Sequence, residues 1–234
     1  MKKSFITTAL LIVAFSVSAQ SLEEIVKKYS DAIHSDKLSS VNTIKISGKM
    51  ATMGMEMPMT MFMKNPNKIK VIYTFNGQDI ITVFDGEKGY TINPLMGSSD
   101  PVELNEDQMK QIQNNNAFRN EVMNYFSSGR LSLEGEENVK GRSAYKLKAA
   151  VEESNPVYMY LDKETGLLIK TSTSVDQMGS AINVDSYMTD YAIAGDVVLP
   201  KKTTTTANGM EAAVISFDDI EVNTTMEDEI FRIK

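Results

Sequence analysis

The 234-residue chain has no cysteine, no tryptophan and a single histidine, His34. The lack of cysteine excludes disulfide bonds, thiol catalysis and cysteine-based zinc sites, and it also excludes a lipid anchor on cysteine. No G-x-S-x-G turn is present, and acidic pairs such as Glu136-Glu137 lie in segments with strand-like spacing, where neighbouring side chains point to opposite faces. We therefore expect no catalytic residues, no metal site and no cofactor.

The chain also lacks a basic cluster. It carries 24 Lys and Arg against 31 Asp and Glu, which gives a formal net charge of −7 at pH 7. Nucleic acids and anionic membrane surfaces attract basic patches, so neither is an expected partner.

Long hydrophobic runs are confined to the N-terminus, where Lys2 and Lys3 precede an apolar run from Phe5 to Val17 and the small residues Ser18 and Ala19. The run is shorter than the roughly 20 residues that a membrane-spanning helix needs, and this order is typical of a secretory signal peptide. We expect cleavage after Ala19. The product would be an exported, monomeric protein with one domain over residues 20–234.

Methionine is abundant in one stretch, where it occupies every second position. The set is Met53, Met55, Met57, Met59, Met61 and Met63. After the turn-like Asn65-Pro66-Asn67, the alternation continues with Ile69, Val71 and Tyr73. Side chains two apart share one face of a strand, so the pattern predicts two neighbouring strands with a common apolar wall.

That wall fits two interpretations. It is either ordinary sheet core or the wall of a ligand cavity, which methionine favours because its unbranched, polarizable side chain adapts to variable apolar partners. As candidate cavity-wall residues we take the later part of the run and its neighbours: Met57, Met59, Met61, Met63, Ile69, Val71 and Tyr73.

Helical spacing occurs at two places. Ser21 and Glu24 form a capping-box pattern, and the apolar spacing that follows predicts an amphipathic helix from residue 22 to about 36. Between residues 103 and 127, three- and four-residue steps predict two short helices joined near Asn114 to Asn116. Their apolar faces, which we expect to form a lid over the concave side of a sheet, carry Met109, Ile112, Phe118, Val122, Met123 and Phe126.

The rest of the chain has a period of two with regular turn signals such as Asn76-Gly77, Asp85-Gly86 and Asn208-Gly209. Strands are expected over 42–52, 57–64, 68–75, 79–84, 88–93, 131–140, 143–151, 156–162, 167–175, 180–189, 197–206 and 211–221. The fold class is therefore mainly β, as a half-open antiparallel barrel or a strongly curled sheet.

The stretch from Gly48-Lys49 through Met63-Lys64-Asn65-Pro66-Asn67 to Asp85-Gly86-Glu87-Lys88-Gly89-Tyr90-Thr91-Ile92-Asn93-Pro94 resembles the LolA family of periplasmic carriers of outer-membrane lipoproteins. The shared features are a strand, a K-x-P-N turn, a strand, a D-G-K turn and an aromatic-x-x-N-P ending. The resemblance implies a half-open barrel whose helical lid covers an apolar cavity for acyl chains. It also implies a periplasmic location, acylated lipoprotein or lipid cargo, an inner-membrane extraction complex and an outer-membrane acceptor.

One position departs from the family pattern. The best-known carriers have an arginine before the turn proline that helps to latch the lid, whereas this chain has Asn65. A neutral amide cannot replace the charged, bidentate guanidinium. We expect the latch to work differently here.

Two other functions remain open at the level of sequence. Thioethers are soft ligands for Cu(I), so the methionine run is compatible with a periplasmic Cu(I)-binding protein, although no histidine or cysteine lies nearby. The same fold would also suit an envelope module that senses lipids or binds a protein partner.

Overall fold

The computed structural model describes residues 20–233 except 115–117, 119, 152–154 and 178. The expected signal peptide over residues 1–19 lies outside the described residues.

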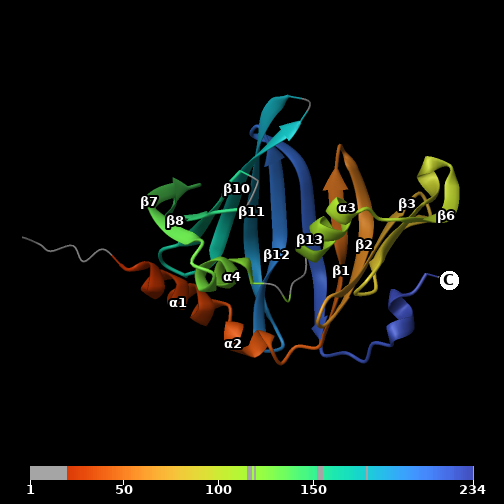
Figure 1. Ribbon diagram of the computed structural model, residues 1–234, viewed down its shortest axis with the longest axis horizontal. Coiled ribbons are helices and arrows are strands. Elements are labelled where there is room, and N and C mark those ends of the chain that lie inside the picture. Colours follow the sequence, from red (N-terminus) through yellow and green to blue (C-terminus); the bar gives the residue numbers. More distant parts are fainter. Residues whose placement is uncertain (1–19, 115–117, 119, 152–154, 178, 234) are drawn as a thin grey trace, which may run out of the picture.

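The described chain forms one antiparallel sheet of thirteen strands, in the order β6-β5-β4-β3-β2-β1-β13-β12-β11-β10-β9-β8-β7. The sheet is curled and open, which confirms the predicted fold class (Figure 1). The strands are β1 (Thr43–Thr52), β2 (Met55–Lys64), β3 (Lys68–Phe75), β4 (Gln78–Phe84), β5 (Gly89–Asn93), β6 (Ser98–Glu103), β7 (Leu131–Val139), β8 (Arg142–Ala149), β9 (Val157–Asp162), β10 (Leu168–Gln177), β11 (Ser180–Ala194), β12 (Val197–Ala207) and β13 (Met210–Val222).

The strand order determines where the helices must lie. Strands β1 to β6 extend outward on one side, β13 back to β7 extend on the other, and the first and last strands pair at the centre. Because β6 and β7 are the two opposite edges, the segment between them has to cross the sheet. It contains α3 (Glu106–Asn114) and α4 (Glu121–Ser127), which lie in front of the sheet in Figure 1.

The predicted N-terminal helix is shorter than expected. The capping box at its start is confirmed, since the Glu24 amide donates to the Ser21 hydroxyl (3.2 Å) and the Ser21 amide donates to the Glu24 carboxylate (3.1 Å). The helix α1 (Leu22–Ala32) ends earlier, because His34 adopts a left-handed conformation with φ 55°. A separate turn of helix, α2 (Ser35–Leu38), follows.

Two 3₁₀ turns complete the fold: η1 (Pro94–Met96) and η2 (Asp228–Phe231). The turn η2 lies in the C-terminal segment that follows β13. Phe231 is buried in a small cluster with Val83 and Met226, and Ile230 packs against that cluster.

Two larger apolar clusters fill the helix-covered face of the sheet. One joins α1 and α4 to β7, β8 and β9, with Ile25, Val26, Val122 and Leu147 among its buried members. The other lies over β1, β2 and β3. The candidate site lies beside this second cluster.

Candidate functional site

A cavity of about 460 Å³ lies between the sheet and the helices. Its floor comes from the central strands β1 to β3 and β10 to β13. Its cover comes from α1, α2, Ile33 between them, α3 and the α4 cap Asn120. The volume is within the range of small-molecule sites in proteins. The space is large enough for part of a flexible apolar ligand.

Strands β2 and β3 supply one wall. Met61 lies opposite Val71 and Met63 lies opposite Ile69, so the four side chains share one face, and Tyr73 continues the row. All five residues line the cavity. The structure thus brings five of the seven predicted wall residues together around one space, while their binding of a ligand stays a prediction.

The other methionines of the run lie elsewhere. Met57 and Met59 are buried, with 8% and 2% of their surface exposed, but neither lines the cavity. Met53 is 90% exposed because it forms, with Gly54, a two-residue hairpin turn with positive φ at both positions. Met55, the first residue after that turn, is 41% exposed. The alternating sequence therefore crosses a turn, and only its later part faces the helices.

Five of the six residues expected in the lid are divided between the two apolar clusters. Ile112 of α3 lines the cavity, and Phe118 packs against the same cluster over β1 to β3. Met109 is half-buried on α3. In contrast, the α4 residues pack in the other cluster, with α1 and strands β7 to β9; they are Val122, Met123 and Phe126. The two helices therefore cover different parts of the sheet.

The proposed latch position, Asn65, is exposed and follows β2. Its backbone amide donates to the carbonyl of Asn42 (2.8 Å), and its side-chain amide donates to the carbonyl of Val41 (3.4 Å). These bonds join the β2–β3 turn to the segment that precedes β1. A role for Asn65 in lid movement stays a prediction.

Most of the cavity lining was not predicted from the sequence. The missed residues come from the N-terminal helices and the C-terminal half of the sheet, and they include Tyr29, Ile33, Leu38, Leu168, Met188, Tyr191, Val197, Leu199, Ile215 and Phe217. Tyr29 and Ile33 were visible as the apolar face of a helix, and the strand residues alternate in the sequence. No local sequence pattern indicates that these residues lie together, because their contact depends on pairing between strands from the two ends of the chain.

The lining is free of ionised groups among the described residues: Asp, Glu, Lys, Arg and His do not occur in it. Burial raises the pKa of Tyr29, of Tyr73 and of Tyr191, and for Tyr29 the nearby Glu121 adds to the effect. These phenols therefore stay neutral near pH 7. The cavity is apolar with a few uncharged polar groups.

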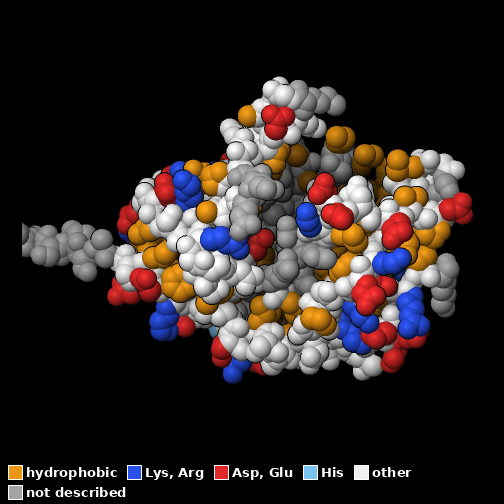
Figure 2. All heavy atoms as spheres, in the orientation of Figure 1, with side chains coloured by type: hydrophobic (Ala, Val, Ile, Leu, Met, Phe, Trp, Pro, Cys, Tyr) orange, Lys and Arg blue, Asp and Glu red, His pale blue; other side chains and the backbone are white. Residues whose placement is uncertain are grey.

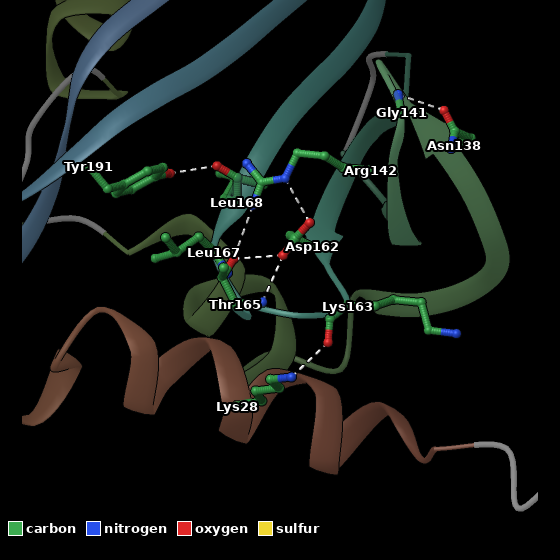
Figure 3. Close-up of polar contacts among 10 residues, drawn as sticks. All are labelled: Lys28, Asn138, Gly141, Arg142, Asp162, Lys163, Thr165, Leu167, Leu168 and Tyr191. Carbon is green, nitrogen blue, oxygen red and sulfur yellow. Dashed lines mark hydrogen bonds and ion pairs between the residues drawn. The ribbon is translucent and has the colours of Figure 1, made fainter.

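Polar contacts hold α1 against the sheet (Figure 3). The Lys28 ammonium donates to the carbonyl of Lys163 in the β9–β10 turn (2.7 Å). That turn is itself fixed by Asp162, which accepts from Arg142 (2.9 Å) and from the amide and hydroxyl of Thr165 (2.7 Å each). Burial alone would raise the pKa of Asp162, but these hydrogen bonds outweigh it and hold the pKa below its usual range.

Helix α3 is attached more weakly. None of its described side chains is buried, and Ile112 is the one that reaches the cavity lining. Helix α1, in contrast, buries Ile25, Val26 and Tyr29. The cover thus combines a firmly packed part and a loosely packed part.

Apolar side chains are also exposed at the end of the sheet where the β1–β2, β12–β13 and β5–β6 connections lie. They include Met53, Met210, Leu95 and Met96. Figure 2 shows hydrophobic side chains along the edge above β1, β2 and β6, with Lys, Arg, Asp and Glu mixed over the remaining visible surface.

Neither a protein-family model nor a curated protein sequence matches the chain. Solved structures do match over almost its whole length. A LolA superfamily protein from Nitrosomonas europaea superposes with a TM-score of 0.58 at 13% identity, covering 92% of this chain and 99% of its own. The fold is LolA-like.

Two further structures support the assignment of a LolA-like fold. A putative outer-membrane lipoprotein-sorting protein domain from Vibrio parahaemolyticus has a TM-score of 0.59 at 11% identity, covering 89% of this chain and 94% of its own. A DUF1329 family protein from Desulfovibrio piger has a TM-score of 0.61 at 13% identity, with coverage of 89% and 97%. At these identities the comparison establishes the fold alone.

Within the described part of the chain, three or more His, Asp or Glu side chains do not converge in a way that would hold a metal ion. No described helix has both the length and the apolar character needed to cross a membrane.

Proposed function

We propose that this chain is a periplasmic carrier that holds the acyl chains of a lipoprotein, or of a related lipid, in the cavity between its sheet and helices. The observation that carries the proposal is the apolar lining of this 460 Å³ space, which contains no ionised group among the described residues. The LolA-like fold supports it, since one structural neighbour is named as a lipoprotein-sorting domain.

The transfer free energy of acyl chains favours a carrier whose cavity wall can adapt to its cargo. Burial of each methylene contributes about 0.8 kcal/mol, so acylated cargo does not leave a membrane for water unaided. A carrier has to hide the chain and still release it. Met61 and Met63 suit this need, because thioether side chains adapt to chains of different shape without rigid complementarity.

We expect α3 to be the part of the cover that opens. This helix contributes Ile112 to the cavity and buries none of its described side chains, whereas α1 is held by Lys28 and by its buried apolar face. A loosely packed segment opens at low cost in free energy. The helix α4 belongs to the firm part of the cover, because Val122 is buried against α1.

The route of the cargo follows from the resemblance to the LolA family. An inner-membrane extraction complex would load the carrier, and an outer-membrane acceptor would receive the cargo. The described residues carry no recognisable nucleotide-binding loop, so the energy for loading would come from the partner.

The proposal is tested with two matched variants in the same methionine run. Met61→Asp places a charge in the cavity wall, and Met53→Asp places the same charge in the exposed turn. Each protein, purified from an envelope extract, is delipidated, titrated with a fluorescent acyl-chain probe and then assayed for release of a lipoprotein from spheroplasts. We expect Met61→Asp to lose probe binding and release by at least tenfold, and Met53→Asp to match the wild type.

The carrier proposal is wrong if the wild-type protein binds no acyl probe and co-purifies with no lipid or lipoprotein. It is also wrong if both variants behave as the wild type does. Binding of the probe without any release of lipoprotein would exclude lipoprotein cargo and leave a related lipid as the ligand, either carried or sensed.

A further inference from the structure

We infer that the cavity selects acyl chains that end in an uncharged carbonyl group, as in an ester or amide, and that Asn120 donates a hydrogen bond to that carbonyl. This inference rests on the proposed function and names the chemistry of its ligand. Its basis is one buried, unsatisfied donor in a largely apolar lining.

Asn120 lines the cavity and caps the start of α4. Its amide oxygen accepts from the backbone amide of Met123 (3.2 Å). That bond fixes the orientation of the side chain, since only the oxygen can accept, and the NH₂ group is then left on the other side. The nitrogen Nδ2 is buried and has no hydrogen-bond partner among the described residues.

A buried donor without a partner is costly, typically by about 1–3 kcal/mol. Two other polar groups of the lining avoid this cost: the Tyr191 hydroxyl donates to the carbonyl of Leu168 (2.5 Å), and the Ser35 hydroxyl bonds to that of Ser30. Among the described residues, Nδ2 of Asn120 is the one buried side-chain nitrogen or oxygen without a partner. An acceptor that arrives with the ligand would remove the penalty, so the free energy of binding would include this hydrogen bond.

The charge of the lining decides which acceptor fits. A carboxylate or phosphate would enter without any Lys, Arg or His in the described lining to pair with it, and an unpaired buried ion is strongly disfavoured. An ester or amide carbonyl is neutral and accepts one or two hydrogen bonds. The site therefore favours an acyl ester or amide over a free fatty acid of the same chain length.

The test compares dodecane, methyl laurate and laurate as competitors of a fluorescent hydrophobic probe at pH 8. Two variants remove the donor. Asn120→Asp keeps the acceptor that caps α4, and Asn120→Leu keeps the volume. The control is Asn105→Asp, because Asn105 accepts from the Gln108 amide (2.9 Å) in an equivalent cap on α3 and does not line the cavity.

We expect methyl laurate to bind wild type more tightly than laurate does. In both Asn120 variants, the ratio of methyl laurate affinity to dodecane affinity should fall about tenfold, and in Asn105→Asp it should be unchanged. A merely structural role of Asn120 would weaken both ligands equally.

The inference is overturned if laurate binds at least as tightly as methyl laurate. It is also overturned if the ratio of methyl laurate affinity to dodecane affinity is unchanged in both Asn120 variants. In either case the proposed function still stands. Failure of all three compounds to displace the probe from the wild type overturns the proposed function as well.

Discussion

The methionines at alternate positions from 53 to 63 have very different surroundings although they share one sequence pattern. Met63 is 1% exposed and packs in the cluster with Ile44, Ile46 and Ile69, whereas Met53 points to solvent from a hairpin turn. An exposed methionine buries little apolar surface, so it contributes little to the free energy of folding. The contribution of each methionine depends on its position relative to the turn.

Truncation should separate these positions. We expect Met63→Ala to lower the free energy of unfolding by about 2–5 kcal/mol, because the lost burial is combined with a cavity that the neighbouring strands cannot close. Met53→Ala should change it by less than about 0.5 kcal/mol. Urea unfolding followed by circular dichroism measures both. Equal midpoints for the two variants would show that Met63 is not packed as described.

At the scale of elements, the C-terminal segment is fastened to the sheet by one carboxylate. Asp228 of η2 accepts from Lys64 (2.7 Å) and pairs with Lys68 (3.0 Å), and these residues flank the β2–β3 turn. The hydrogen bonds from the two lysines lower the pKa of Asp228 to about 2. Phe231, three residues later, is buried beside Val83. The charge contact and the apolar contact thus hold the same short segment.

The lowered pKa predicts how this attachment depends on pH. A carboxyl group whose pKa is depressed in the folded state stabilises it above its ordinary value near 4, and the effect is lost as pH falls toward 2. We expect Asp228→Asn to melt below the wild type at pH 7 and to converge with it at pH 2. The difference at pH 7 should also shrink in high salt.

The control for this experiment is Glu229→Gln. Glu229 pairs with Arg232 at 3.6 Å, where both side chains are largely exposed, so its removal should have little effect. Differential scanning calorimetry at both pH values gives the comparison. A deficit of Asp228→Asn that is equally large at pH 2 would contradict a role for the ionised carboxylate.

At the scale of the whole molecule, the curled sheet depends on the pairing of β1 with β13. This ladder is the one that joins strands β2 to β6 to strands β7 to β12 in the sheet order. It contains a register shift between Ser47 and Gly48, opposite Phe217 and Asp219. Such a bulge bends a sheet, and Phe217 lines the cavity. The β1–β13 ladder therefore shapes the site as well as the fold.

This dependence explains what the sequence could and could not predict. Alternation predicted the strands of each meander, and it predicted that Met61 and Val71 share a face, because both are local patterns. The edge strand β6 was missed, since Ser98–Glu103 is mostly polar and contains Pro101. The wall that contains Phe217 and Tyr191 was missed because no local pattern records that the last strand returns to the first.

Gly48 offers a test of the close approach of β1 and β13. A β-carbon at this position would overlap the carbonyl oxygen of Ser216 and lie 2.9 Å from Cα of Phe217, and both are backbone atoms that cannot rotate away. We expect Gly48→Ala to lower the free energy of unfolding by about 1–3 kcal/mol, since β13 has to shift to relieve the overlap. The shift would also move Phe217, so binding of the acyl probe should weaken.

The matched control is Ser47→Ala, which changes a neighbouring side chain of β1 without adding a β-carbon. It should alter the free energy of unfolding by less than about 0.5 kcal/mol. Urea titration and probe binding are measured on the same samples. If Gly48→Ala unfolds at the wild-type midpoint, β1 and β13 do not approach as closely as described. If the variant is destabilised but binds the probe normally, the β1–β13 ladder supports the fold without shaping the cavity.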